Sequence, residues 1–144
     1  MTAVPTIVVS GPLGSGKTSL LRHLIDQTTQ LRFAAIINDF GELGIDGDLL
    51  RAHTSRVIEV TNGCFCCTNL NELPLTLQTL RMQYDPDYIV VEMSGEADPI
   101  PIVREIKALW PLVELTRKVA VLDLTLETDI LINDNVIRNS IISA

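Results

Sequence analysis

The sequence has few aromatic residues, little positive charge and no long apolar run. Only 4% of its 144 residues are Phe, Trp or Tyr, and 11 Lys and Arg stand against 18 Asp and Glu, which gives a net charge of −7. Because the basic residues are scattered along an acidic chain, we do not expect a nucleic-acid partner. No apolar run approaches the ~20 residues that span a bilayer, and the first residues lack the pattern of a signal peptide. The expected location is the cytoplasm, with no membrane partner.

The rest of the composition is typical of one globular domain. With 47% hydrophobic and 20% charged residues, the chain can bury a single core, and it shows no repeat or linker. Short β-branched runs alternate with helical patterns, and the runs lie at residues 6–9, 33–37, 57–60, 88–91 and 118–122. Several runs are apolar at consecutive positions, as strands covered on both faces must be. The pattern predicts an α/β domain with a mostly parallel sheet flanked by helices.

Helical patterns separate these runs. Apolar residues recur at helical spacing over 20–25 and again over 70–80, where Pro74 is tolerable only in the first turn. A third helix has Asp98 as a candidate N-cap, Pro99 at its first position, a buried stripe that includes Leu109, and an end at Pro111. The apolar spacing from 125 to 144 predicts one more helix.

One motif indicates phosphate binding. The segment GPLGSGKT, residues 11–18, fits GxxxxGK[ST] in full and lies directly after an expected strand and before an expected helix. Glycines allow successive N–H groups to converge on phosphate oxygens, Lys17 would reach the β- and γ-phosphates, and the Thr18 hydroxyl would bind Mg²⁺. A glycine-rich turn without function is the alternative, but it does not explain Lys-Thr at these positions. The expected nucleotide-binding residues are Gly11, Gly14, Ser15, Gly16, Lys17, Thr18 and Ser19.

Phosphoryl transfer also needs an acidic group near the metal and a group that senses the γ-phosphate. Glu92 follows the run at 88–91, where a Walker-B carboxylate belongs, and the backbone N–H of Gly95 is placed to face a γ-phosphate. Alternatively, Glu92 is a surface carboxylate at the end of a strand. The acidic, glycine-rich segment that contains Asp39 and Glu42 would suit a mobile switch.

All three cysteines lie in one short segment. Cys64, Cys66 and Cys67 follow the run at 57–60, at the sheet edge where ligands of such folds bind. In a reducing compartment they stay thiols, and a modest turn brings two or three sulfurs to one cation. Zn²⁺ is the default, with a fourth ligand from Asp39, Glu42 or water. The alternative interpretation is that the cysteines are small buried apolar residues.

In their order along the chain, GPLGSGKT, NDFGELGID, NGCFCC and EMSGEADPIPIV resemble the CobW family of metal-handling GTPases. The resemblance covers almost the whole chain, and a P-loop combined with a GCxCC segment is more specific than either motif alone. It implies a P-loop GTPase fold, Mg²⁺-dependent GTP hydrolysis, and delivery of Zn²⁺ or Co²⁺ to a client protein. It assigns residues 11–18 to phosphate and Mg²⁺, Glu92 and Gly95 to the Walker-B and γ-phosphate positions, and Cys64, Cys66 and Cys67 to metal.

The sequence also departs from the family. Asp39 stands where glutamate is more usual, which keeps the charge but shortens the reach by one methylene. The Asn-Lys-x-Asp motif that reads guanine is absent, and the chain stops at Ala144, about where its strand is expected. We therefore expect a fragment that lacks one or more last strands and a C-terminal domain, with an open sheet edge that favours association.

The leading hypothesis is the nucleotide domain of a metallochaperone GTPase. In it, nucleotide orders residues 39–48 and changes the geometry at the cysteines. A P-loop kinase or ATPase with structural cysteines is one alternative, and a non-catalytic metal-binding fragment is another.

Overall fold

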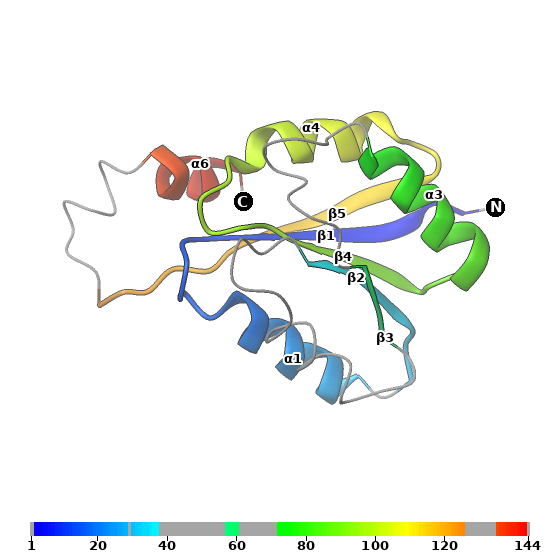
Figure 1. The fold of residues 1–144 in the computed structure, drawn as a ribbon, viewed down its shortest axis with the longest axis horizontal. Helices are drawn as coiled ribbons and strands as arrows, with labels where there is room; N and C mark the ends of the chain where they lie inside the picture. The colour runs from blue at the N-terminus through cyan, green and yellow to red at the C-terminus, as the bar shows by residue number, and fades with distance from the viewer. Residues whose placement is uncertain (1, 29, 38–56, 61–71, 126–134, 144) are drawn as a thin grey trace.

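The computed structural model describes residues 2–28, 30–37, 57–60, 72–125 and 135–143, and Figure 1 shows their arrangement. Within these residues, five strands form one sheet, in which every pairing is parallel and the spatial order is β3-β2-β4-β1-β5. The strands are β1 (Val4–Ser10), β2 (Phe33–Ile37), β3 (Val57–Val60), β4 (Tyr88–Glu92) and β5 (Val113–Ala120). This confirms the predicted mostly parallel sheet.

Helices cover both faces of this sheet. Helix α1 (Lys17–Gln27) lies on one face, and α3 (Leu73–Tyr84), α4 (Pro99–Ala108) and α6 (Asn135–Ser143) lie on the other (Figure 1). Residues of β2 alternate between two buried clusters: Ala35 packs in the cluster of α1, and Ile36 packs in the cluster of α3 and α4. Because both faces are buried, the central strands are apolar at consecutive positions, as the sequence predicted.

Local sequence sets the helix ends. The Asp98 side chain accepts a hydrogen bond of 3.0 Å from Ile100 N, so the predicted N-cap of α4 is confirmed. Pro74 lies in the first turn of α3, where its missing N–H costs no helical hydrogen bond. The predicted end of the third helix was too late. Helix α4 ends at Ala108, and Leu109 is its C-cap, whose backbone N donates to Ile106 O. The restriction that Pro111 imposes falls on Trp110, the residue before it.

The bounds of β5 also differ from the prediction. The strand begins at Val113 and ends at Ala120, so the run at 118–122 missed its first half and included Val121 and Leu122, which lie beyond it. Strand β5 pairs with β1 at the end of the strand order, and its first residues alternate between buried Val113 and exposed Glu114. A search for continuous apolar runs overlooks such a half-exposed strand.

The helix predicted over 125–144 is confirmed for the part of it that the structure describes as α6. Thr125 lies outside any helix, residues 126–134 lie outside the described ranges, and α6 comprises Asn135–Ser143. Its Ile137 is buried and α6 packs on α4. No described helix is long and apolar enough to cross a membrane.

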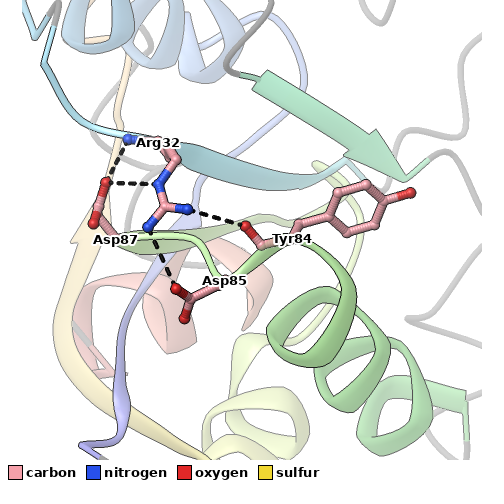
Figure 2. Close-up of polar contacts among 4 residues, drawn as sticks. All are labelled: Arg32, Tyr84, Asp85 and Asp87. Atoms are coloured by element: carbon pink, nitrogen blue, oxygen red, sulfur yellow. Dashed lines mark hydrogen bonds and ion pairs between the residues drawn. The ribbon is translucent and has the colours of Figure 1, made fainter.

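One arginine joins the amino ends of β2 and β4. Arg32 donates from its backbone N to Asp87 Oδ2 at 2.8 Å, and its guanidinium contacts the Asp87 and Asp85 carboxylates and the Tyr84 carbonyl (Figure 2). These hydrogen bonds, with the Arg32 charge, lower the pKa of Asp87 below its ordinary value. Because all strands run parallel, this cluster lies at the sheet edge opposite the glycine-rich loop, which follows the carboxyl end of β1.

Candidate nucleotide-binding site

The glycine-rich loop connects the carboxyl end of β1 to the first residue of α1. Gly16 precedes the helix in a left-handed conformation (φ 93°), and it has no side chain to cap the first helical N–H groups. These N–H groups and the positive end of the helix dipole favour an anion at this point. The loop therefore has the local structure that the motif predicted.

Gly11 packs closely against the backbone of Val121, the residue that follows β5. A Cβ on Gly11 would lie 2.0 Å from the Val121 carbonyl oxygen, and φ at Gly11 is +139°, so only glycine fits there without strain. Val121 N donates to Ser10 O at 2.8 Å and holds the two segments together. The residue that follows β5 is thus part of the wall of the loop. This contact could not be predicted from the sequence, because no local pattern indicates that two backbone segments approach each other across the sheet.

The Lys17 side chain folds into the loop. It is only 6% exposed, and its Nζ donates to the carbonyls of Gly11 at 3.0 Å and Pro12 at 2.9 Å. Loop carbonyls thereby compensate a buried ammonium group. The expected contact with β- and γ-phosphates remains a prediction, and it requires Nζ to exchange these carbonyls for phosphate oxygens.

Thr18 and Glu92 meet where α1 begins and β4 ends. The Thr18 hydroxyl donates a hydrogen bond of 2.8 Å to Glu92 Oε1, and Glu92 is 4% exposed. The alternative that Glu92 is a surface carboxylate is therefore wrong. Because the hydroxyl hydrogen is directed at Glu92, the lone pairs of the Thr18 oxygen stay available to a cation. Mg²⁺ prefers such oxygen ligands, so this pair beside the phosphate loop fits the expected Mg²⁺.

Gly95 packs directly on the loop. A Cβ on Gly95 would lie 2.2 Å from Leu13 N and 2.7 Å from Leu13 Cα. Glycine is required here by this close approach. The contact brings the residue expected at the γ-phosphate position to the phosphate loop, although its N–H contact to phosphate stays a prediction.

The other predicted residues divide into two groups. Gly14 has φ +75° in the loop, and Ser19 is exposed on α1. The buried Ser15 Oγ has no hydrogen-bond partner among the described residues, which fits a hydroxyl that donates to an anion when one is bound. Asp39, Glu42, Cys64, Cys66 and Cys67 lie outside the described ranges. Within those ranges, no group of three His, Cys, Asp or Glu side chains could hold a metal ion.

The chain has a P-loop nucleotide-binding domain. It is defined by the glycine-rich loop, the lysine folded into it and the buried carboxylate, which meet at the carboxyl ends of parallel strands. A family comparison agrees, because the model of the CobW/HypB/UreG nucleotide-binding domain matches residues 5–140. The chain belongs to this family.

Curated relatives have similar sequences over most of this chain. The zinc chaperone CobW of Pseudomonas aeruginosa is 40% identical over an alignment of 121 residues, and the match covers 77% of this chain and 32% of that protein. The zinc chaperone YjiA of Escherichia coli is 37% identical, over 72% of this chain and 34% of its own. The zinc-regulated GTPase metalloprotein activator 1 of Dictyostelium discoideum is 35% identical, over 69% of this chain and 24% of its own. The chain thus spans about a third of these relatives or less.

Solved structures support the fold. The hydrogenase maturation factor HypB of Archaeoglobus fulgidus has a TM-score of 0.61 at 20% identity, over 89% of this chain and 58% of that chain. A Zn(II)-bound triple mutant of the YjiA GTPase has a TM-score of 0.54 at 23% identity, over 84% of this chain and 41% of that one.

Proposed function

We propose that this chain is the nucleotide-binding part of a cytoplasmic metallochaperone GTPase, which binds GTP with Mg²⁺, hydrolyses it, and couples its nucleotide state to a transition metal. The observation that carries the proposal is the Thr18–Glu92 hydrogen bond beside the phosphate loop. This pair supports a Mg²⁺ site, because P-loop hydrolases hold their metal with a loop Ser or Thr hydroxyl and a nearby Walker-B acid. The names of the relatives, zinc chaperones and a zinc-regulated GTPase, support both halves of the proposal.

Three residues near the phosphate loop, Lys17, Glu92 and Gly95, have distinct roles in this proposal. Lys17 moves from the Gly11 and Pro12 carbonyls to phosphate oxygens and stabilises the negative charge that develops on them. Glu92 orients the Thr18 hydroxyl so that its oxygen faces the cation. Gly95 donates its backbone N–H to the γ-phosphate. When bound, Mg²⁺ neutralises phosphate charge and orients the leaving group.

The metal that is carried belongs to a second site. We assign Zn²⁺ or Co²⁺ to Cys64, Cys66 and Cys67, with Asp39 or Glu42 as further ligands, because thiolates and carboxylates both bind these cations. A client protein receives the metal. If nucleotide and metal are coupled, each must change the affinity of the other by the same factor. Zinc titration with GDP and with a non-hydrolysable GTP analogue tests this, and equal zinc affinities would refute the coupling.

The proposed GTP hydrolysis is tested by measuring phosphate release from GTP and from ATP, each with Mg²⁺. Lys17→Ala should abolish turnover, while Lys107→Ala, the same change at an exposed position of α4, should leave it unaltered. Turnover that persists in Lys17→Ala would exclude the site. A preference for ATP would favour a P-loop ATPase or kinase. Zinc binding without any turnover would favour a non-catalytic metal-binding module.

A further inference from the structure

The carboxylate of Asp98 joins two helices. Its Oδ1 accepts the N-cap hydrogen bond from Ile100 N at 3.0 Å, and its Oδ2 accepts from Asn139 Nδ2 at 3.1 Å. Asn139 lies on α6, which packs on α4 (Figure 1) and buries Ile137 to 3% exposure. One side chain at the start of α4 thus holds α6 as well.

Asp98 ends a short segment that begins at the candidate site. Strand β4 ends at Glu92, and two hydrogen bonds close the chain into a turn after it: Ala97 N donates to Ser94 O at 3.1 Å, and Glu96 N donates to Ser94 Oγ at 3.4 Å. Ser94 is buried, which restricts the movement of this turn. Asp98 follows this hydrogen-bonded turn directly, so the position of its carboxylate depends on the position of the turn.

The same turn touches the phosphate loop through Gly95. This residue lies against the backbone of Pro12 and Leu13, so closely that a Cβ would be 2.2 Å from Leu13 N. The Pro12 carbonyl in turn accepts from Lys17 Nζ at 2.9 Å. A continuous series of contacts therefore runs from the lysine of the loop to α6. Such a packed series can carry coupling between two sites if a ligand changes one end of it.

We propose that a γ-phosphate at the loop strengthens the docking of α6 on α4, through Gly95 and the Asp98–Asn139 hydrogen bond. The inference rests on the proposed function, because it requires a nucleoside triphosphate at this loop. When the Gly95 N–H donates to a γ-phosphate, the turn after β4 gains a fixed partner, and Asp98 is held where it meets Asn139. A diphosphate lacks that group and leaves the turn as it is. Helix α6 then reports the presence of the third phosphate.

The coupling between α6 and the phosphate loop can be measured through the affinity for nucleotide, because thermodynamic coupling is reciprocal. If triphosphate strengthens the α6 contact, loss of that contact must weaken triphosphate binding by the same factor. Asn139→Ala should lower the affinity for the β,γ-imido analogue of GTP by about fivefold or more, within the usual range of such coupling, and should leave GDP affinity unaltered. Asn139→Asp should have a larger effect, because it places a second carboxylate beside Asp98. Asn135→Ala changes the same residue type at an exposed position of α6 and serves as the matched control.

Hydrogen exchange of the α6 amides gives a second readout. The GTP analogue should slow exchange in 135–143 relative to GDP, and Asn139→Ala should remove this difference while circular dichroism stays unchanged. If Asn139→Ala binds the analogue as tightly as the unaltered chain, or weakens both nucleotides equally, the inference is wrong although the site stands. If the unaltered chain binds neither nucleotide, the proposed function fails with it.

Discussion

The Thr18 hydroxyl and the Glu92 carboxylate lie 2.8 Å apart, although 74 positions separate them in the chain. The contact exists because β1 and β4 are neighbours in the sheet, with Val9 opposite Glu92, so that the end of β4 faces the start of the helix that follows β1. A sheet whose sequence-distant strands pair in this way brings the two halves of the candidate Mg²⁺ site together.

Removal of the Thr18 hydroxyl should affect both stability and metal dependence. Thr18→Ala deletes a hydrogen bond to a buried carboxylate, so the free energy of unfolding should fall by about 1–3 kcal/mol. Mg²⁺ should then no longer raise the affinity for GTP, because the oxygen ligand is gone. Thr18→Ser keeps the hydroxyl and serves as the control. Urea unfolding and nucleotide titration with and without Mg²⁺ measure the two effects, and a Thr18→Ala variant that keeps its Mg²⁺ dependence would contradict the assignment.

A single methyl group at Gly95 should disrupt the loop. In Gly95→Ala the new Cβ would approach Leu13 N to 2.2 Å, and backbone atoms cannot avoid it by changing rotamer. The turn and the loop must separate, so we expect a loss of about 1–3 kcal/mol of stability, as for other overpacked sites, together with weaker GTP binding. Thermal unfolding and titration of the nucleotide test this. Ala108→Ser, an equally small change at an exposed position of α4, should have no effect on either quantity.

Much of the fold could be predicted from local patterns. Strand β2 is apolar at five consecutive positions, because its residues pack alternately in the cluster of α1 and in the cluster of α3 and α4. Asp98 and Pro99 predicted the start of α4 because capping is a local effect. The loop motif was equally clear, since both its chemistry and its neighbours are contiguous in the chain.

Contacts across the sheet could not be predicted in this way. The approaches of Val121 to Gly11 and of Leu13 to Gly95 depend on the strand order, which no local pattern encodes. The first half of β5 was missed for a related reason, because it lies beside only one described strand and alternates in burial. Even so, the sequence has a glycine at each close approach, where any residue with a Cβ would meet the opposite backbone.

Two leucines of α3 should differ sharply in their contribution to stability. Leu77 is fully buried in the core of α3 and α4, whereas Leu75 is 66% exposed. Leu77→Ala should lower the free energy of unfolding by about 2–5 kcal/mol, through lost burial and the cavity left behind. Leu75→Ala on the same helix should change it by less than about 0.5 kcal/mol, as at other surface sites. Urea unfolding of both variants measures the difference, and similar losses would show that α3 is packed in another orientation.

The Arg32–Asp87 contact should make stability depend on pH in the acid range. The backbone N–H of Arg32, and then its guanidinium, stabilise the ionised Asp87 side chain and lower its pKa from an ordinary value of 3.8. A depressed folded-state pKa contributes stability that is present above the unfolded value of 3.8 and is lost as the pH falls through the folded value. Asp87→Asn should therefore lower the urea midpoint at pH 7, and the difference from the unaltered chain should shrink as the pH is taken below 3.8. Asp85→Asn is the control, because the Asp85 side chain is 84% exposed and its 3.5 Å contact with Arg32 is open to solvent screening. A deficit in Asp87→Asn that stayed constant down to acid pH would mean that the carboxylate charge is not what stabilises this edge of the sheet.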